Sequence, residues 1–209
     1  MDIPKTPSEQ FKTTFRKNFP GKIAIWSKQD KSTSFFTADE LAQAEQYCLK
    51  KAQTSDVYFG VGLVRDDLTN GRGKAEDVIA IPGLWLDIDI GAAGHKGIAY
   101  PPDIQSAWKI VLEFPVKPSM VVHSGYGLHA YWLFDELLLL DTPEKREKAA
   151  ALSTSFQQKL RDLFATHGFK IDNTSDLARV LRVVGTRNHK NESTKKVRVI
   201  YPKSKEAIK

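Results

Sequence analysis

The sequence predicts a mixed α/β fold of the α+β kind, in which strands and helices interleave along 209 residues. Three patterns lead to this prediction. Apolar and polar residues alternate over 84–90 and again over 128–134, as in strands with one buried face. Apolar residues recur at helical spacing over 104–112. Thr142-Pro143 starts a further long helix, with proline at the favoured first position. Such an order favours helices packed in layers on a sheet.

The N-terminal part of the chain is expected to form a β-α-β unit. Residues 22–26 form a short strand, and Thr37 with Glu40 forms a capping box at the start of a helix. One face of that helix is apolar: Leu41, Ala44, Cys48 and Ala52. Residues 57–64 are continuously apolar and include two glycines, which indicates a buried strand. The polar loop 69–74, with the sequence TNGRGK, follows.

The middle of the chain predicts a helix and a hairpin. After a loop rich in glycine and alanine at 91–97, Pro101-Pro102-Asp103 opens a helix over 104–112. Residues 119–123 and 128–134 are two strands joined by a tight turn with two glycines. On the second strand, Leu128, Ala130, Trp132 and Phe134 share one face, and His129 and Tyr131 share the other.

The last third of the chain begins with the long helix, which runs over 142–167 and ends at a glycine. A short strand is expected at 169–172, a helix at 175–184 and a last strand at 196–201. The helix at 175–184 would place Arg179 and Arg182 on one face, because they are three positions apart.

Composition and charge limit the function classes. Hydrophobic residues make up 41% and charged residues 27% of the chain, and neither a membrane span nor a signal peptide is recognisable. We therefore expect a cytoplasmic protein with no membrane partner. The single cysteine, Cys48, excludes an internal disulfide and a cysteine-rich zinc site. The net charge is +6, but residues 179–209 carry +8, which favours a polyanionic partner such as nucleic acid or nucleotide phosphates.

The strand at 84–90 contains the sequence Leu-Asp-Ile-Asp. Its alternation places Asp87 and Asp89 on the face opposite the apolar residues, about 6–7 Å apart along the backbone. Two neighbouring carboxylates repel each other unless a cation lies between them, and hard oxygen ligands suit Mg²⁺ or Mn²⁺. A solvated strand face is the alternative for this pair considered alone.

Two further segments carry candidate site residues. At the hairpin turn, Ser124, Gly125 and Gly127 are typical of a loop that binds phosphate through backbone N–H groups, and His129 follows on the polar face. In the third segment, Asp172 follows a short apolar strand and completes a set of three carboxylates. A possible phosphate-binding set comes after it: Arg179, Arg182, Thr186, Asn188 and Lys190. Asp176 is expected to cap a helix and to pair with Arg179.

In this order, the three segments resemble the archaeo-eukaryotic primase (AEP) superfamily, specifically its small primase-polymerases from plasmids, phages and CRISPR-linked operons. The first motif of that family is matched by Asp87 and Asp89. The second is matched by Ser124, Gly125, Gly127 and His129. The third is matched by Ile171 and Asp172, followed by Arg179, Arg182, Gly185, Thr186, Asn188 and Lys190. The resemblance covers about residues 58–201.

The resemblance implies a template-dependent DNA primase-polymerase that transfers a (d)NTP to a primer 3′-hydroxyl or an initiating nucleotide. Asp87, Asp89 and Asp172 would hold two Mg²⁺ or Mn²⁺ ions, with Asp176 as the alternative third ligand. His129 would share in catalysis. The nucleotide would be bound by Ser124, Gly125, Gly127, His129, Arg179, Arg182, Thr186, Asn188 and Lys190. Arg72 and Lys74 would also reach the nucleotide or the template.

The resemblance also implies a two-lobed catalytic domain over 1–209. A mixed sheet like that of an RNA-recognition motif, within 80–209, would carry the metal site beside a small N-terminal α/β lobe at 20–75. The expected partners are a single-stranded DNA template, its primer and a dNTP or NTP, and the protein would act as a monomer without zinc. One alternative is that these 209 residues are a catalytic piece of a longer protein.

Two other functions use some of the same residues. A two-metal nuclease would need the carboxylates but has little need for a set that binds a triphosphate. A non-catalytic module that binds single-stranded nucleic acid would need the basic surface but not three carboxylates beside a histidine.

Overall fold

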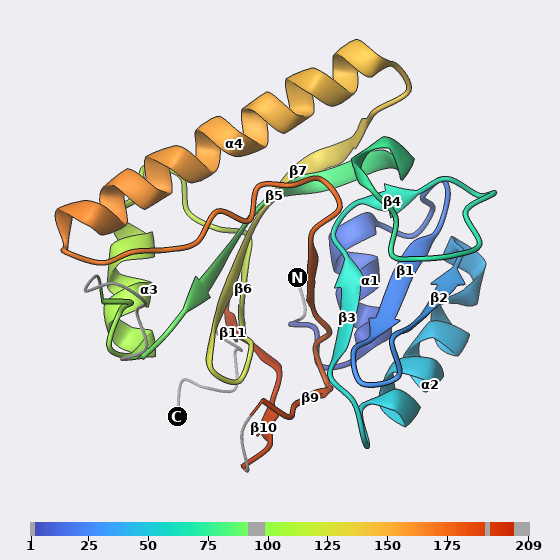
Figure 1. Cartoon of the computed structure of the whole chain (residues 1–209), viewed down its shortest axis with the longest axis horizontal. Helices are drawn as coiled ribbons and strands as arrows, with labels where there is room; N and C mark the ends of the chain where they lie inside the picture. The colour runs from blue at the N-terminus through green and yellow to red at the C-terminus, as the bar shows by residue number, and fades with distance from the viewer. Residues whose placement is uncertain (1–2, 92–98, 191–192, 203–209) are drawn as a thin grey trace.

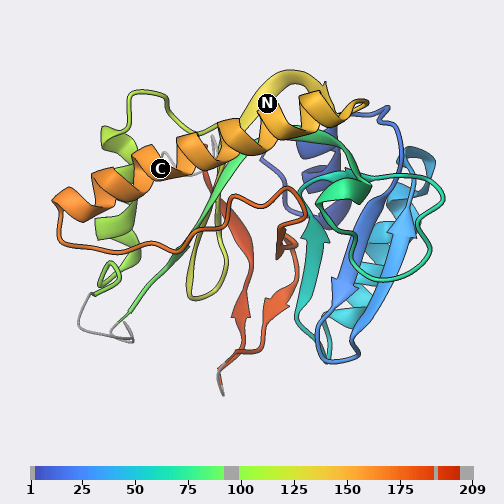
Figure 2. The ribbon, with the colours of Figure 1, turned by 45° about the horizontal axis from the view of Figure 1, so that its top comes forward.

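The computed structural model describes residues 3–91, 99–190 and 193–202. Two groups of elements lie side by side, each built around an antiparallel sheet (Figure 1). The segment that follows the long helix α4 crosses from one group to the other and carries strand β8, as Figures 1 and 2 show. The two groups are therefore joined a second time, because residues 180–182, near the end of the chain, return to the N-terminal sheet.

The N-terminal sheet has four strands in the order β2-β1-β3-β8. They are β1 (Ile23–Ser27), β2 (Ser32–Phe36), β3 (Val57–Gly60) and β8 (Val180–Arg182). All of its pairs are antiparallel. The last strand comes from the far end of the chain, so this sheet is completed only when residues 180–182 add to its edge.

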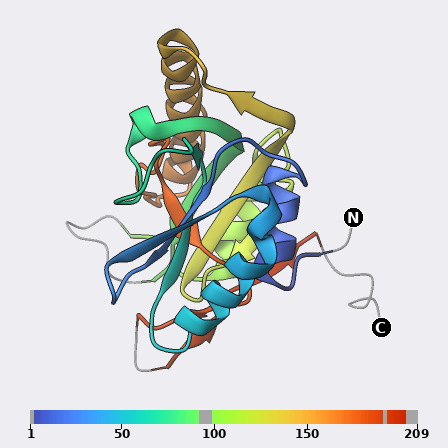
Figure 3. The ribbon, with the colours of Figure 1, turned by 90° about the vertical axis from the view of Figure 1, so that its right-hand side faces the viewer.

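Two helices cover one face of the N-terminal sheet (Figure 3). They are α1 (Pro7–Phe15) and α2 (Leu41–Lys51), the second preceded by the 3-10 turn η1 (Ala38–Glu40). Thr6 caps α1 through a capping box with Glu9. The buried side chains of these helices and of the inner sheet face form one apolar cluster, in which the ring centroids of Phe11 and Phe59 are 5.6 Å apart.

The C-terminal sheet has five strands in the order β11-β6-β7-β5-β4, also antiparallel throughout. They are β4 (Leu63–Val64), β5 (Val78–Asp89), β6 (Met120–His123), β7 (Gly127–Leu139) and β11 (Arg198–Tyr201). The pairing of β5 with β7 forms the centre of the sheet and carries the Leu-Asp-Ile-Asp sequence. The 3-10 turn η2 (Ala75–Asp77) precedes β5, and the short strands β9 (Arg187–Asn188) and β10 (Lys195–Lys196) pair separately.

Helices α3 (Ile104–Glu113) and α4 (Pro143–Thr166) cover one face of the C-terminal sheet (Figures 1 and 2). Asp103 and Thr142 cap them, each accepting a hydrogen bond from a backbone N–H three residues later. Leu86 and Ile88 point into the core beneath these helices. The opposite side of the same strand therefore presents Asp87 and Asp89 away from α3 and α4. Within the described residues, no helix has the length and apolar character needed to cross a membrane.

Most of the expected elements are confirmed. The helices at 104–112 and 142–167, the hairpin of β6 and β7, and the strand and capped helix of the N-terminal unit all form. The two faces predicted for the second hairpin strand are also correct, since Tyr131 and Trp132 belong to different apolar clusters. Helix α1, strand β2 and the split-off strand β4 were not expected, although the Thr6-to-Glu9 capping box marks the start of α1 in the sequence.

Three expectations about the elements are wrong. The apolar run 57–64 forms two strands in different sheets, because the chain changes direction at Gly62, where a side chain would lie 2.8 Å from the carbonyl oxygen of Leu177. Residues 175–184 form a turn and strand β8 instead of a helix, since Val180 and its neighbours pair with the edge of β3. The strand at 169–172 is reduced to a bridge between Ala99 and Phe169.

Two smaller corrections concern the C-terminal sheet and the chain end. The expected mixed sheet is antiparallel along all its strands in the described ranges, and the bridge between Ala99 and Phe169 is a parallel pairing outside it. The last strand, expected at 196–201, is divided at Val197, whose backbone pairs with Gly185 and Thr186 instead. The expected loop at 91–97 lies almost wholly outside the described residues.

Candidate active site

The carboxylates of strand β5 lie beside the histidine of strand β7. Asp87 is directly opposite His129 in the antiparallel register, and Asp89 is opposite Gly127. Residues opposite each other on one face have their Cβ atoms about 5 Å apart. The alternation that the sequence shows thus places both carboxylates and the imidazole on the same face, opposite the face that packs in the cluster beneath α3 and α4.

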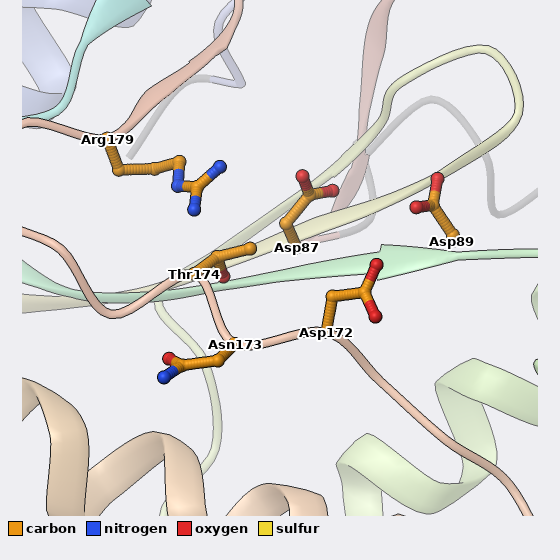
Figure 4. A pocket seen from close by; sticks show the side chains of 6 residues that line it. All are labelled: Asp87, Asp89, Asp172, Asn173, Thr174 and Arg179. Carbon is orange, nitrogen blue, oxygen red and sulfur yellow. The ribbon is translucent and has the colours of Figure 1, made fainter.

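A cavity of about 470 Å³ opens over these carboxylates. Asp172 enters it from the chain segment that follows α4, and Arg179 enters from the segment just before β8 (Figure 4). The cavity is lined by Asp87, Asp89, Asp172, Asn173, Thr174 and Arg179. The structure therefore brings Asp172 to the strand carboxylates, although its role as a ligand stays a prediction. Asp176, the alternative third ligand, does not line the cavity, and its carboxylate lies 2.8 Å from Arg179.

A buried hydrogen-bond network holds the Asp172 segment against the sheet. The indole Nε1 of Trp85 donates to the carbonyl oxygen of Thr174 at 2.7 Å. The side chain of Gln157, on α4, donates to the carbonyl of Trp85 at 2.9 Å and accepts from the backbone N–H of Thr174 at 2.9 Å. Gln157 is 1% exposed, so these bonds form without competition from water. Helix α4 thus positions Asp172 through Gln157.

The pKa values of the strand carboxylates are raised. Burial raises the pKa of Asp87 to about 6; nearby Arg179 and Arg182 lower it, and the charge of Asp172 raises it further. Burial and the charge of Asp87 raise the pKa of Asp89. Carboxylates that are costly to ionise together gain the most from a bound cation.

The donor set suits a hard divalent cation, because it consists of carboxylate oxygens that repel one another. In the described ranges, no group of three or more His, Cys, Asp and Glu side chains is arranged to hold a metal ion as it stands. Part of Asp172 is also engaged elsewhere, since its Oδ2 accepts a hydrogen bond from the Tyr100 hydroxyl at 3.1 Å. The three carboxylates share one cavity, so side-chain rotation would be needed for them to meet on an ion.

A second cavity, of about 190 Å³, adjoins the first through Asp87 and Asp89. Its remaining walls come from the hairpin, from the N-terminal sheet and from the segment after β8. They are Ser124, Tyr126 and His129; Lys28, Tyr58, Val180 and Arg182; and Asn188 and Lys190. This cavity therefore lies where the two sheets face each other, with carboxylates on one wall and cationic side chains on the other.

His129 is a buried, neutral group. Burial lowers its pKa to about 3, and the positive charge of Arg182 lowers it as well. Its Nε2 lies 3.5 Å from Oδ1 of Asp87. Because the imidazole is uncharged near neutral pH, this contact is not an ion pair. A neutral imidazole can still donate one hydrogen bond to a ligand oxygen.

The glycines of the hairpin turn are required by packing. A side chain at Gly127 would lie 2.3 Å from the carbonyl oxygen of Ile88, and Gly125, at φ +102°, lies against Asn188. The Gly125 N–H donates to the ring nitrogen of His123 at 3.0 Å. Neither glycine lines either cavity. The turn thus brings Ser124 and Tyr126 to the site, and the Gly125 N–H is already bonded within the protein.

Arg182 is engaged inside the protein. Its Nη1 lies 2.8 Å from Oδ1 of Asp56, its Nη2 donates to Oδ2 at 3.3 Å, and its guanidinium lies 4.7 Å from the centre of the Tyr58 ring. Asp56 also accepts a hydrogen bond from the backbone N–H of His189 at 2.7 Å. The charge expected for phosphate binding is therefore paired with a carboxylate at 2% exposure.

Two more members of the expected phosphate-binding set have internal partners. The Thr186 hydroxyl donates to the carbonyl of Val183 at 2.6 Å, and Thr186 lines neither cavity. The Asn188 amide donates to the carbonyl of Ser124 at 2.8 Å. Lys190 differs, because its exposed side chain lines the second cavity and has no ion-pair partner among the described residues.

The glycine loop lies away from both cavities. Arg72 covers the ring of Trp26 at 4.5 Å from its centre. Lys74 lies 3.6 Å from Glu76 at the surface. Neither residue lines the cavities, so a role for them at the nucleotide stays a prediction.

Several residues of the site were not expected. Lys28, Tyr58 and Tyr126 line the second cavity. Within the apolar run 57–64, Tyr58 is the residue whose side chain carries a hydroxyl, and this is the signal in the sequence that it faces away from the core. No pattern in the neighbouring sequence predicts Lys28 as a site residue, because only the arrangement of the two sheets brings it to the second cavity.

Comparison with solved structures identifies the fold. The AEP domain of the primase-polymerase (PrimPol) of cyanophage S-2L matches 94% of this chain and 90% of its own length, with 18% sequence identity and a TM-score of 0.53. The chain has the AEP primase-polymerase fold. The resemblance predicted from the three motifs is confirmed at this level.

Two further structures show a weaker likeness to this chain. Primase RepB′ matches 85% of it, and this chain covers 49% of that protein, with 14% identity and a TM-score of 0.45. The catalytic domain of RepB′ in complex with initiator DNA matches 86%, over 74% of its own length, with 14% identity and a TM-score of 0.43. No protein-family model and no curated protein matches the chain.

Proposed function

We propose that this chain is a template-dependent DNA primase-polymerase, which transfers a nucleotide from a (d)NTP to a primer 3′-hydroxyl. The observation that carries the proposal is the junction of two cavities at Asp87 and Asp89. One cavity offers three carboxylates and the other offers lysines and hydrogen-bond donors. A nucleotidyl transfer needs both, because its leaving group is a polyanion and its attacking group is a hydroxyl.

Asp87, Asp89 and Asp172 would hold two divalent cations. When bound, Mg²⁺ or Mn²⁺ lowers the pKa of the attacking hydroxyl and stabilises charge on the transferred phosphate. The protein's own part is to keep these carboxylates on a rigid strand and on a segment held by Gln157 and Trp85. Arg179 balances their charge from the cavity wall.

The triphosphate would lie in the second cavity. Lys190 and Lys28 are its exposed cations, and we assign to them the main charge contacts, since Arg182 is paired with Asp56. His129 and the Ser124 hydroxyl would donate hydrogen bonds without adding charge. The basic segment after residue 179 would contact template phosphates.

The test is extension of a labelled primer on a single-stranded DNA template, with dNTPs or NTPs and with Mg²⁺ or Mn²⁺. Template-directed extension by the wild type, lost in Asp87→Asn/Asp89→Asn, is the expected result. Asp135→Asn is the matched control, because that carboxylate is exposed on β7 outside both cavities. Shortening of the primer would indicate a nuclease, and DNA binding without reaction would leave a binding module.

A further inference from the structure

The outer face of the N-terminal sheet carries a row of aromatic and cationic side chains. Trp26 on β1 is directly opposite Tyr58 on β3, which is opposite Arg182 on β8. The ring centres of Trp26 and Tyr58 are 5.4 Å apart. Each ring is covered by a guanidinium, Arg72 over Trp26 at 4.5 Å and Arg182 over Tyr58 at 4.7 Å.

These rings are not part of a core. The inward-facing neighbours Ile25 and Phe59 are fully buried, whereas Trp26 and Tyr58 are only partly buried and pack against none of the apolar clusters of the described residues. A tryptophan on the outer face of a sheet exposes a large apolar surface, and packing in the core does not explain its presence there.

The row leads towards the carboxylates at its β3 and β8 end. Beside the row on β1, Ala24 packs with Val64 and Leu68. Tyr58 and Arg182 of the row, and Lys28 beside it, line the second cavity together with Asp87 and Asp89. A ligand lying along the row would therefore continue towards the carboxylates.

The charge of the row suits an anionic strand. Lys28 and Arg72 are exposed, and neither forms an ion pair within the described ranges. The carboxylate next to the row, Asp56, is paired with Arg182. Proteins that bind single strands combine aromatic rings, on which bases stack, with cations that contact phosphates.

We propose that this outer face binds the unpaired bases of a single-stranded DNA template on its way to the carboxylates. A base stacks on the Trp26 face that Arg72 covers in the free protein, and the displaced guanidinium pairs with a backbone phosphate. Gly71 and Gly73 flank Arg72 with positive φ angles of 72° and 83°, and Gly71 has open space around it. This inference extends the proposed function, since it names the strand's path to that site.

The experiment compares two labelled 12-nucleotide strands by fluorescence anisotropy, without nucleotide. One strand is oligo(dT), and the other is abasic, with the same phosphates but no bases. Trp26→Ala is expected to bind oligo(dT) about tenfold more weakly, the size of one lost base–aromatic stack, and to bind the abasic strand as the wild type does. Arg72→Gln should weaken both strands and reduce the salt dependence by about one phosphate contact.

Two controls make the result specific. Trp108→Phe changes another partly buried tryptophan, on α3, and should leave both affinities unchanged. Trp26→Phe keeps an aromatic ring and should recover most of the oligo(dT) affinity, even if Trp26→Ala folds poorly. The inference would be overturned if Trp26→Ala lost the same affinity for both strands, or lost no affinity for oligo(dT).

Failure of this inference and failure of the proposed function give different results. Primer extension by a wild type whose oligo(dT) affinity does not depend on Trp26 would overturn only the stacking surface. Selective loss of oligo(dT) binding in Trp26→Ala, from a protein that extends no primer, would overturn only the polymerase.

Discussion

The paired strands β5 and β7 and the segment 172–190 both carry polar side chains, but they use them differently. On the two strands, Asp87, Asp89 and His129 project into cavities. Along the segment, Arg182, Thr186 and Asn188 bond to other parts of the protein. The comparison teaches that side chains typical of phosphate binding can instead hold a segment against the rest of the protein, and that burial and partners decide between the two uses.

The largest effect is expected on the paired strands β5 and β7. Asp87→Asn keeps the shape of the side chain and removes its charge, so primer extension should fall at least about a thousandfold, or about 4 kcal/mol of barrier. Because burial raises the pKa of Asp87 to about 6, the charged form costs stability near pH 7. The free energy of unfolding, measured in urea without metal, should therefore be unchanged or higher. A variant that lost activity by unfolding would contradict this description of strands β5 and β7.

The next effect is expected in the segment, and on stability. Arg182→Ala leaves Asp56 buried without its partner, which typically costs about 3–5 kcal/mol. Urea unfolding followed by circular dichroism measures this loss. Lys28→Ala is the matched control, because it removes an exposed cation from the same cavity and should cost less than about 0.5 kcal/mol. A stable Arg182→Ala protein with a raised KM for nucleotide would break the comparison.

The polar face of strands β5 and β7 was largely predictable from sequence, and the segment was not. Alternation with a period of two fixes which face carries Asp87 and His129, because it depends only on neighbouring residues. The sequence 180–182 has no such local rule. It becomes a strand by pairing with β3, and the partner of Arg182 is 126 positions away in the chain. The cationic residue Lys28 was missed for the same reason, since only the facing of the two sheets brings it to the site.

A third prediction concerns the residue through which a helix supports the site. Gln157→Leu removes three buried hydrogen bonds and leaves the Trp85 carbonyl and the Thr174 N–H unpaired, at a cost of about 2–3 kcal/mol. The Asp172 segment should lose its fixed position, so kcat should fall about tenfold while affinity for DNA stays the same. Gln158→Leu, one position along the same helix and bonded only to the exposed Asp162, is the control. An unchanged kcat in a folded Gln157→Leu protein would show that α4 does not position the site through Gln157.

The smallest effect is expected from a fall in pH. Acid removes only part of what the Asp56–Arg182 pair contributes to the free energy of unfolding, while the rest of the protein stays folded. Burial raises the pKa of Asp56, but hydrogen bonds from Arg182 and the His189 N–H outweigh it, so the pKa lies below 3.8. A carboxyl group whose pKa is lower in the folded than in the unfolded protein stabilises the fold at pH values above the unfolded pKa. This stabilisation is lost as the pH falls through the folded pKa. The free energy of unfolding should therefore drop faster below about pH 4 in the wild type than in Asp56→Asn, which is less stable at pH 7 but lacks this titration. Parallel pH profiles of the two proteins would show that the carboxylate of Asp56 does not join the segment to the N-terminal sheet.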